Sequence, residues 1–351
     1  MSGERPPGPL CTEAGPVLPA LGLGCAQLGN LGSPMPEERA HRIVHAALEG
    51  GCRLLDTAPH YGVGLSEERL GRALSGVPRD GYLLSTKAGR RLRPLAPGEP
   101  PEDCGFAGTP ARARFWDFSR DGVRRGLEES LRRLGTDHAD IVYLHDVENH
   151  VREVRETGYP ALAALRDEGM VRHIGFGMNL SGVLARLVAE FAPDVVLCAG
   201  RWTLLERTAY DDLLPECARR GTRVVAGGVY NSGLLADPRP GAHYDYRPAP
   251  PALLERARRV AAVCGRHGVP LRAAALRFPF GHSAVASAVV GAGTPEEVED
   301  NIRMSGRPVP DALWHELVAE GLLDGDLPLP YGMPRGASCG EPYGSSCGEV
   351  R

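Results

Sequence analysis

The chain has 351 residues, of which 42% are hydrophobic and 24% are charged, and this ordinary globular composition can bury a large core. The formal net charge is −4, and acidic and basic residues are interspersed, so the sequence indicates neither a nucleic-acid partner nor an acidic membrane partner. There is no run of 18 apolar residues, no signal-peptide pattern at the start, and no paired spacing among the nine cysteines. These features predict a cytoplasmic protein with reduced thiols, no membrane segment and no metal site.

In chain order, short apolar runs bounded by turn residues alternate with longer runs that have apolar residues three or four positions apart. The short runs predict strands over Leu21–Cys25, Arg53–Thr57, Tyr82–Lys87, Asp140–His145, Val171–Gly177, Val195–Ala199, Thr222–Gly227 and Ala284–Gly291. The longer runs predict helices over Glu37–Glu49, Ser66–Leu74, Ser119–Leu134, Pro160–Glu168, Leu180–Glu190, Tyr210–Arg220, Pro251–His267 and Pro295–Met304. Ser66 and Ser119 are expected N-caps, and Pro295 is an expected first-turn proline.

Eight β/α alternations predict a parallel sheet that closes into a (β/α)8 TIM barrel. An open, doubly wound sheet is the alternative, because glycines follow the first strand, although no acidic residue follows at the expected spacing of about 20 residues. We expect one barrel domain over residues 18–330, a flexible segment over 1–17, and a disordered tail rich in Gly, Ser and Cys over 331–351. The Pro- and Arg-rich segment 89–117 is expected to be a functional lid or a disordered loop.

Three consecutive predicted strands end on ionisable side chains. Alternation with period two puts Asp56, Lys87 and His145 on the same faces as apolar residues of their strands. If these faces point into a barrel, the three side chains meet at its carboxyl end, where barrel enzymes keep their active sites. Tyr61, in a Gly-rich loop after the first of these strands, can fold over the same end. The structural alternatives are a buried ion pair between Asp56 and Lys87, and a hydrogen-bonded core histidine.

These four residues together suit proton transfer. An ammonium group close to a phenol favours the phenolate, so Lys87 is expected to lower the pKa of Tyr61 from its ordinary value of about 10. Asp56 would keep Lys87 charged and oriented, and His145 would bind the same substrate oxygen as Tyr61. The set is therefore interpreted as a general acid/base for carbonyl–alcohol interconversion, with the hydride supplied by a cofactor.

Several motifs resemble the aldo-keto reductase superfamily in matching order over residues 21–304: DTAPHYGVGLSEERLG, LLSTKAG, YLHD and GAGTPEEVEDN. The resemblance implies a (β/α)8 barrel. The catalytic tetrad that it implies is Asp56, Tyr61, Lys87 and His145. The stretches IGFGMN, AGRWTLLE and GGVYNSGLLA are similar to bacterial sugar dehydrogenases that act on D-threo-aldoses or L-fucose, with pyridoxal dehydrogenases as close relatives.

The same resemblance implies a nicotinamide cofactor. The residues that it assigns to cofactor binding are Met178, Asn179, Gly227, Gly291, Gly293, Thr294, Glu297 and Asn301. The chain departs from the family pattern at strand ends, because Met178, Ala199 and Gly227 replace a serine, a glutamine and a tyrosine, so the nicotinamide pocket is expected to be rebuilt. The residues assigned to the substrate pocket are His60, Trp116, Trp202, Tyr230 and Asn231. Ordinary core packing is the alternative for the aromatic members of this set.

The closing turn also indicates which cofactor is used. Superfamily members that prefer NADP carry a lysine before this turn and an arginine on the next helix, and here the matching residues are Gly291 and Glu297. A carboxylate repels a 2′-phosphate by about 1 kcal/mol at 4 Å even in bulk water. The prediction is therefore that NAD is preferred and that NADP is possible.

The sequence as a whole predicts an NAD(P)-dependent oxidoreductase that oxidises an aldose of the L-fucose or D-threo type at C1 to its lactone. Its partner is then a small sugar or aldehyde. Oxidation or reduction of another small alcohol or aldehyde, such as pyridoxal, is one alternative. A nucleotide-binding barrel with a regulatory or interaction role is another, and the oligomeric state is left open.

Overall fold

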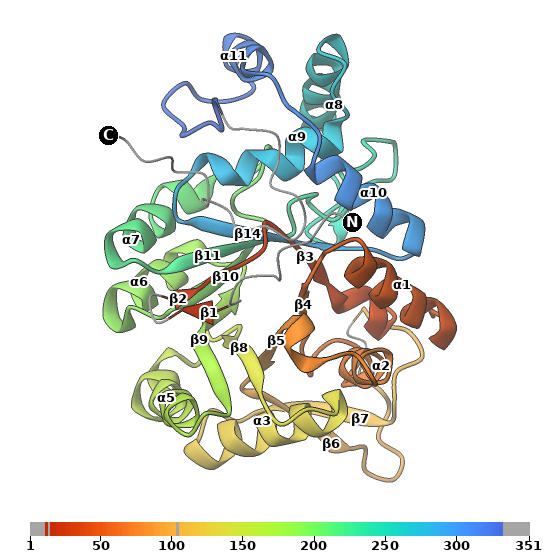
Figure 1. Cartoon of the computed structure of the whole chain (residues 1–351), viewed down its shortest axis with the longest axis vertical. Helices are drawn as coiled ribbons and strands as arrows, with labels where there is room; N and C mark the ends of the chain where they lie inside the picture. The colour runs from red at the N-terminus through yellow and green to blue at the C-terminus, as the bar shows by residue number, and fades with distance from the viewer. Residues whose placement is uncertain (1–10, 13–14, 103–104, 333–351) are drawn as a thin grey trace, which may run out of the picture.

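Eight parallel strands close into a barrel at the centre of the molecule, in the spatial order β3–β4–β5–β8–β9–β10–β11–β14 (Figure 1). The computed structural model describes residues 11–12, 15–102 and 105–332. The barrel strands are β3 (Leu21–Gly24), β4 (Leu54–Asp56), β5 (Leu83–Ala88), β8 (Ala139–His145), β9 (Val171–Met178), β10 (Val195–Ala199), β11 (Arg223–Gly227) and β14 (Val285–Gly291). All eight predicted strands are confirmed. The open-sheet alternative is wrong, because β14 pairs with β3 and closes the ring.

The interior of the barrel is a separate apolar cluster. It contains Leu54, Leu83 and Ile141, together with Tyr143, all of which are buried. These are the residues that share a strand face with the ionisable strand ends, so the predicted faces do point into the barrel. Leu18, which precedes β3, joins the same cluster at the amino-terminal end.

A second and larger core fills the layer between the strands and the surrounding helices. The helices that follow the barrel strands are α1 (Glu37–Glu49), α2 (Leu65–Ala73), α3 (Arg120–Leu134), α5 (Tyr159–Asp167), α6 (Ser181–Phe191), α7 (Leu213–Arg220), α8 (Pro251–Arg266) and α10 (Pro295–Ser305). All the predicted helices are confirmed to within a few residues. The short helices α4 (Val151–Glu153), α9 (Leu271–Arg277) and α11 (Asp311–Ala319) were not predicted.

The helix caps follow the sequence in two cases of three. Ser119 caps α3 by accepting from the Gly122 backbone N–H at 3.0 Å, and Pro295 lies in the first turn of α10. The prediction that Ser66 is an N-cap is wrong. Helix α2 begins one residue earlier, and the Ser66 hydroxyl instead donates to the carbonyl oxygen of Cys25 at 2.7 Å, because the side chain is buried against the barrel.

The segment 89–117 forms a hairpin at its two ends, so the expectation of a loop is wrong there. β6 (Arg90–Pro94) pairs antiparallel with β7 (Arg112–Trp116), and the hairpin lies beside α3 (Figure 1). Its arginines are held by carboxylates on neighbouring elements; Arg91, for example, pairs with Glu129 of α3. Charged residues on both faces hid the strand pattern, because the partners that stabilise them come from other parts of the chain.

The ends of the chain are only partly described. β1 (Cys11–Thr12) pairs with β2 (Gly15–Pro16), so part of the segment expected to be flexible forms a short ladder. Residues 1–10, 13–14 and 333–351 lie outside the described residues, and this includes nearly all of the expected tail. Several cysteines of the barrel, including Cys198 and Cys217, are buried, as expected for reduced thiols.

Candidate active site

β4 and β5 place an aspartate and a lysine side by side inside the carboxyl end of the barrel. Lys87 Nζ donates to Asp56 Oδ2 at 2.8 Å and to the carbonyl oxygen of Thr57 at 2.8 Å. The other carboxylate oxygen of Asp56 accepts from Ser85 Oγ at 2.7 Å. Both charged side chains are buried, with 1% of Lys87 and 4% of Asp56 exposed. Burial opposes the charge on Lys87, but the interactions with Asp56 and Tyr61 together outweigh burial and raise the lysine pKa above its ordinary value.

Tyr61 lies in the turn after β4, with the Lys87 ammonium 4.8 Å from the centre of its ring. Burial raises the pKa of Tyr61 to about 12, and the nearby ammonium opposes this only in part. The expected direction of the Lys87 effect is therefore right, but the expected net lowering of the Tyr61 pKa is wrong. Removing water from around a phenolate outweighs the attraction of one ammonium. Tyr61 is protonated at neutral pH in the free protein.

A close backbone contact fixes the turn that carries Tyr61. Gly62 has a φ of +62°, and a Cβ atom there would lie 2.4 Å from the carbonyl oxygen of Gly29. Only glycine accommodates both the left-handed conformation and the close approach of the two chains. The Gly-rich loop seen in the sequence is thus the feature that folds Tyr61 over the barrel end.

His145, the last residue of β8, completes the cluster. Its ring is edge-on to that of Tyr61, with the centres 6.3 Å apart. Burial, followed by the positive charge of Lys87, holds the pKa of His145 well below its ordinary value, so the imidazole is neutral. Its Nδ1 atom is buried and has no hydrogen-bond partner among the described residues. The structure therefore brings Asp56, Tyr61, Lys87 and His145 together at one end of the barrel.

The β6–β7 hairpin adds two arginines that the sequence analysis missed. Arg90 pairs with Asp146 and lies 3.3 Å from His60 Nδ1, and Arg114 lies 2.6 Å from the same nitrogen. Phe106 packs edge-on to His60, with the ring centres 5.5 Å apart. In the sequence RARFW, arginine alternates with other residues. This period-two signal could have predicted strand β7 and the face of the strand on which Arg114 lies.

Trp116 ends β7 with 41% of its surface exposed. The Arg90 guanidinium lies 4.3 Å from the centre of its ring, and the ring stacks on Phe118 and contacts His150. The exposed face leaves Trp116 available for a ligand at the barrel's carboxyl end.

The other two aromatic residues assigned to the substrate pocket make core contacts. Trp202 is buried, packs against the tilted ring of Phe278 with the ring centres 4.8 Å apart, and donates from Nε1 to the carbonyl oxygen of Pro279 at 2.9 Å. This is the core-packing alternative, and we do not retain Trp202 as a pocket wall. Tyr230 is partly buried, and its hydroxyl donates to Asn301 Oδ1 at 2.9 Å, so these two predicted residues hold each other.

The strands of the second half of the barrel end on small or apolar residues. Met178 is buried at the end of β9, whereas Asn179 follows it in an exposed position. A Cβ atom on Gly227, at the end of β11, would lie 3.3 Å from the Leu197 side chain, so little room remains there for a larger residue. A Cβ atom on Gly291, at the end of β14, would lie 2.3 Å from Gln27 Oε1.

The turn after β14 is held by its own side chains. Thr294 is the N-cap of α10, and its hydroxyl accepts from the Glu297 backbone N–H at 3.2 Å. The Glu297 carboxylate folds back and accepts from the Gly293 backbone N–H at 2.7 Å. A negative charge therefore already lies at the N-terminus of α10, where helices favour anions.

Two polar side chains near these strand ends have buried atoms without an internal partner. Asn231 is 2% exposed, and neither its amide nitrogen nor its oxygen bonds any described residue. The Oε1 atom of Gln27 is also buried and has no hydrogen-bond partner among the described residues. Asn231 and Ser232 both have positive φ, and the turn is held by its own backbone, with the Asn231 N–H donating to the Gly228 carbonyl oxygen at 2.8 Å and the Gly233 N–H donating to that of Tyr230 at 3.1 Å. These unpaired amide atoms fit a ligand that carries both hydrogen-bond donors and acceptors, as a nicotinamide dinucleotide does.

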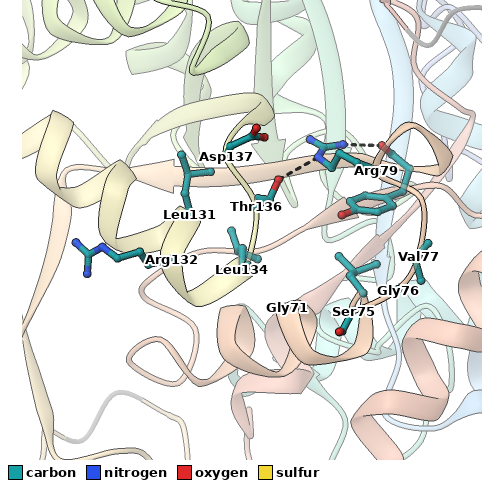
Figure 2. A pocket seen from close by; sticks show the side chains of 13 residues that line it. Gly71, Ser75, Gly76, Val77, Arg79, Leu131, Arg132, Leu134, Thr136 and Asp137 are labelled. Carbon is teal, nitrogen blue, oxygen red and sulfur yellow. Dashed lines mark hydrogen bonds between the residues drawn. The ribbon is translucent and has the colours of Figure 1, made fainter.

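A cavity of about 710 Å³ lies at the opposite end of the barrel, between the C-termini of α2 and α3 (Figure 2). Arg79 crosses it and donates to Thr136 Oγ1 at 3.3 Å and to the Tyr82 carbonyl oxygen at 3.1 Å. The same guanidinium pairs with Asp140 at 2.7 Å. Because the polar groups that cross this cavity already bond one another, we place the active site at the carboxyl end.

Comparison with known proteins agrees with this geometry. A model of the aldo/keto reductase family matches residues 20–319. The chain belongs to this family. It is 42% identical over 321 residues to the D-threo-aldose 1-dehydrogenase of a Pseudomonas species, covering 90% of this chain and 98% of the relative. It is 36% identical to the pyridoxal 4-dehydrogenase of Microbacterium luteolum, over 89% of this chain and 96% of the relative.

Solved structures of aldo/keto reductases share the fold. An aldo-keto reductase of Bacillus halodurans, solved in its holo form, is 26% identical with a TM-score of 0.67, covering 88% of this chain and 93% of that one. This aldo/keto reductase is therefore an oxidoreductase, and members of its family use nicotinamide cofactors. No helix among the described residues is long and apolar enough to cross a membrane. Within the same residues, no group of His, Cys, Asp and Glu side chains is arranged to hold a metal ion.

Proposed function

We propose that this aldo/keto reductase oxidises an aldose at C1 to the lactone, with NAD as the preferred cofactor. The observation that carries the proposal is the buried cluster of Asp56, Lys87, Tyr61 and His145, in which an ion pair lies beneath a phenol and a neutral imidazole. The similarity to D-threo-aldose 1-dehydrogenase supports an aldose as the substrate class.

The four residues divide the proton chemistry among them. Tyr61 as phenolate takes the proton of the anomeric hydroxyl, and the same group returns a proton when a carbonyl is reduced. Lys87 stabilises the phenolate by its charge, and Asp56 holds the ammonium in place. His145, being neutral, can donate a hydrogen bond to the substrate oxygen without competing for its proton. A nicotinamide cofactor, when bound, supplies the acceptor for the hydride that leaves C1.

The second half of the barrel would hold the cofactor. The candidates are the predicted residues Met178, Asn179, Gly227, Gly291, Gly293, Thr294, Glu297 and Asn301, joined by Gln27 and Asn231 because of their unpaired amides. The preference for NAD rests on Glu297, whose carboxylate already occupies the first turn of α10. A neutral ribose hydroxyl can donate to that carboxylate, whereas a 2′-phosphate would be repelled.

His60 and Trp116 are the proposed substrate contacts. His60 lies beside both the Tyr61 and His145 rings, at 6.0 and 5.7 Å between ring centres, and Trp116 presents an exposed aromatic face at the same end. Sugars expose apolar C–H faces, which pack against aromatic rings, and hydroxyl groups, which bond to polar side chains.

The experiment is a panel of aldoses and small aldehydes, each tested with NAD and with NADP by the absorbance of the reduced nicotinamide. We expect an aldose to be oxidised with NAD more efficiently than any simple alcohol, and the product to be a lactone. Pyridoxal belongs in the panel, because the pyridoxal 4-dehydrogenase relative supports it as the second candidate substrate. Turnover of pyridoxal without turnover of any aldose would overturn the aldose proposal but not the role of the cluster.

A further inference from the structure

One guanidinium connects the two loops that carry the proton-transfer groups. Arg90 on β6 bonds both His60, which precedes Tyr61 in the chain, and Asp146, which follows His145. Arg114 on β7 bonds the same nitrogen of His60 from the other strand of the hairpin, at 2.6 Å, and is itself held by Glu102 at 2.6 Å. The hairpin therefore contacts the catalytic cluster at the two residues next to it in sequence.

These contacts decide which nitrogen of His60 carries a proton. A guanidinium has only donors and stays protonated in proteins, so Nδ1 of His60 must be the acceptor. In a neutral imidazole the proton then lies on Nε2. The surroundings keep the ring neutral: burial, Arg90, Arg114 and, more weakly, Lys87 lower the pKa of His60 to about 3.

The opposite nitrogen is left for a ligand. No described residue makes a hydrogen bond to Nε2 of His60, while its ring lies 5.7 Å from that of His145 and 6.0 Å from that of Tyr61, between ring centres. A free N–H donor on a ring next to Tyr61 and His145 suits a neutral oxygen of a substrate that those two residues bind.

We propose that Arg90 and Arg114 are positioning residues that hold His60 as its Nε2–H tautomer, and that this N–H donates to the C2 hydroxyl of an aldose. The proposal about the hydroxyl rests on the proposed function. The proposal about the tautomer does not, because it follows from the contacts alone. Selection for a hydroxylated substrate over a plain aldehyde is the consequence.

The tautomer is read by nuclear magnetic resonance of the full chain labelled with ¹⁵N at histidine, with the His60 signals assigned by their loss in His60→Gln. At neutral pH we expect a bare Nδ1 and a protonated Nε2. Arg114→Met should move the ring toward the Nδ1–H tautomer, whereas Arg114→Lys, which keeps a charged donor, should leave it as in the wild type. A wild-type His60 protonated at Nδ1, or doubly protonated, overturns the proposal whether or not the variants fold.

The donor is tested by a matched pair of substitutions. His60→Gln places an amide near Nε2 and keeps a distal donor, whereas His60→Asn reaches only as far as Nδ1 and loses it. For an aldose relative to its 2-deoxy counterpart, the ratio of kcat/KM should fall about tenfold in His60→Asn, the loss of one hydrogen bond, and much less in His60→Gln. An unchanged ratio in His60→Asn would show that His60 does not contact the C2 hydroxyl. If the wild type oxidises no aldose at all, the proposed function fails, and the resonance experiment still decides the tautomer.

Discussion

The two halves of the barrel differ at their carboxyl ends. In the first half, buried ionisable side chains lie at or next to the ends of strands β4, β5 and β8, and the two carboxylate oxygens of Asp56 accept from Lys87 and Ser85. In the second half, β9, β10, β11 and β14 end on Met178, Ala199, Gly227 and Gly291, and the buried amides nearby have no partner. The charged pair of the first half is bonded within the fold, although His145 Nδ1 has no described partner, whereas in the second half neither polar atom of the Asn231 amide has a described partner.

This difference has an energetic reason. A buried charge is tolerated only when it is paired, so the proton-transfer group has to be assembled within the folded chain. An unpaired buried amide costs about 1–3 kcal/mol, which a bound cofactor can recover by bonding it. Substitutions in the first half, where we propose the proton-transfer group, are therefore expected to lower the stability of the free protein, whereas substitutions in the second half, where we propose the cofactor site, are expected to change it little.

The largest effect should come from the proton carrier. Tyr61→Phe keeps the ring and removes the hydroxyl, so turnover should fall by about 10²–10⁴, while the dissociation constant of the cofactor changes little. The matched control is Tyr143→Phe, which removes another phenol buried in the barrel interior and should keep most of the activity. Near-normal turnover in Tyr61→Phe would mean that another group transfers the proton.

Breaking the ion pair should affect both stability and pH dependence. Lys87→Met leaves the Asp56 carboxylate buried without its ammonium, so the free energy of unfolding should fall by about 3–5 kcal/mol. Lys87→Arg keeps the charge and should lose less. Asp56→Asn should act more weakly than Lys87→Met on activity, by disordering Lys87.

The pH dependence has a defined sign. The pKa of Tyr61 is about 12, so the phenolate fraction and the rate of oxidation should rise with pH throughout the neutral range. Lys87 lowers that pKa, so its removal in Lys87→Met should raise it further and move the profile of any residual activity to higher pH. An unmoved profile would mean that the ammonium does not act on Tyr61.

In the second half of the barrel, we expect a substitution to weaken cofactor binding more than it lowers the stability of the free protein. Asn231→Gly keeps the left-handed backbone, which has a φ of +48°, and removes an amide without partners, so the free protein should lose less than about 1 kcal/mol while NAD binds several-fold more weakly. Asn30 has a similar backbone, with a φ of +70°, but its amide bonds Ala107 and Met35. Asn30→Gly should therefore cost more stability than Asn231→Gly. Equal losses in the two variants would show that Asn231 is bonded within the fold.

Cofactor choice should respond to the charge on the first turn of α10. Glu297→Arg should raise the catalytic efficiency with NADP relative to NAD by about tenfold, equivalent to about 1.4 kcal/mol. Glu296→Arg changes the charge by the same amount at the neighbouring exposed position and is expected to do less. A wild type that clearly prefers NADP, or a Glu297→Arg variant without a gain, would contradict the NAD assignment.

The smallest effect on activity is expected for Trp116, the more exposed of the two proposed substrate contacts. Trp116→Ala should raise KM for an aldose by roughly twofold to fivefold, as for an exposed aromatic contact of about 0.5–1 kcal/mol, with less change for the cofactor. Tyr331, 42% exposed and in contact with the His315 ring, is a control of similar exposure that is not assigned to the site. Equal changes for sugar and cofactor in Trp116→Ala would favour a purely structural role.

The barrel was predictable because its strands are short apolar runs with clear boundaries and its helices carry one apolar stripe. Helix α9 lacks that stripe, since residues 273–277 are all buried, and so its pattern does not distinguish it from a buried strand or loop. The β6–β7 hairpin was missed because its arginines are stabilised by distant carboxylates. Local patterns therefore predict elements that bury one face, and they miss those that depend on partners elsewhere.

The cluster that we propose to be catalytic was predictable for a related reason. Period two alone placed Asp56, Lys87 and His145 on inward faces of neighbouring strands. The sign of the Tyr61 pKa shift was not predictable, because it depends on how completely the folded chain removes water from the phenol. The contacts of His60 with the two arginines of the hairpin were also not predictable, because residues 60, 90 and 114 meet only when the hairpin folds against the barrel.

The most direct test of the account follows the hydride itself. The aldose that the panel identifies is prepared with deuterium at C1 and oxidised with NAD, and the reduced cofactor and the sugar product are analysed by nuclear magnetic resonance. The account predicts deuterium at C4 of the nicotinamide and a lactone as the first product. Reduced cofactor without deuterium, or a product oxidised at another carbon, would contradict it.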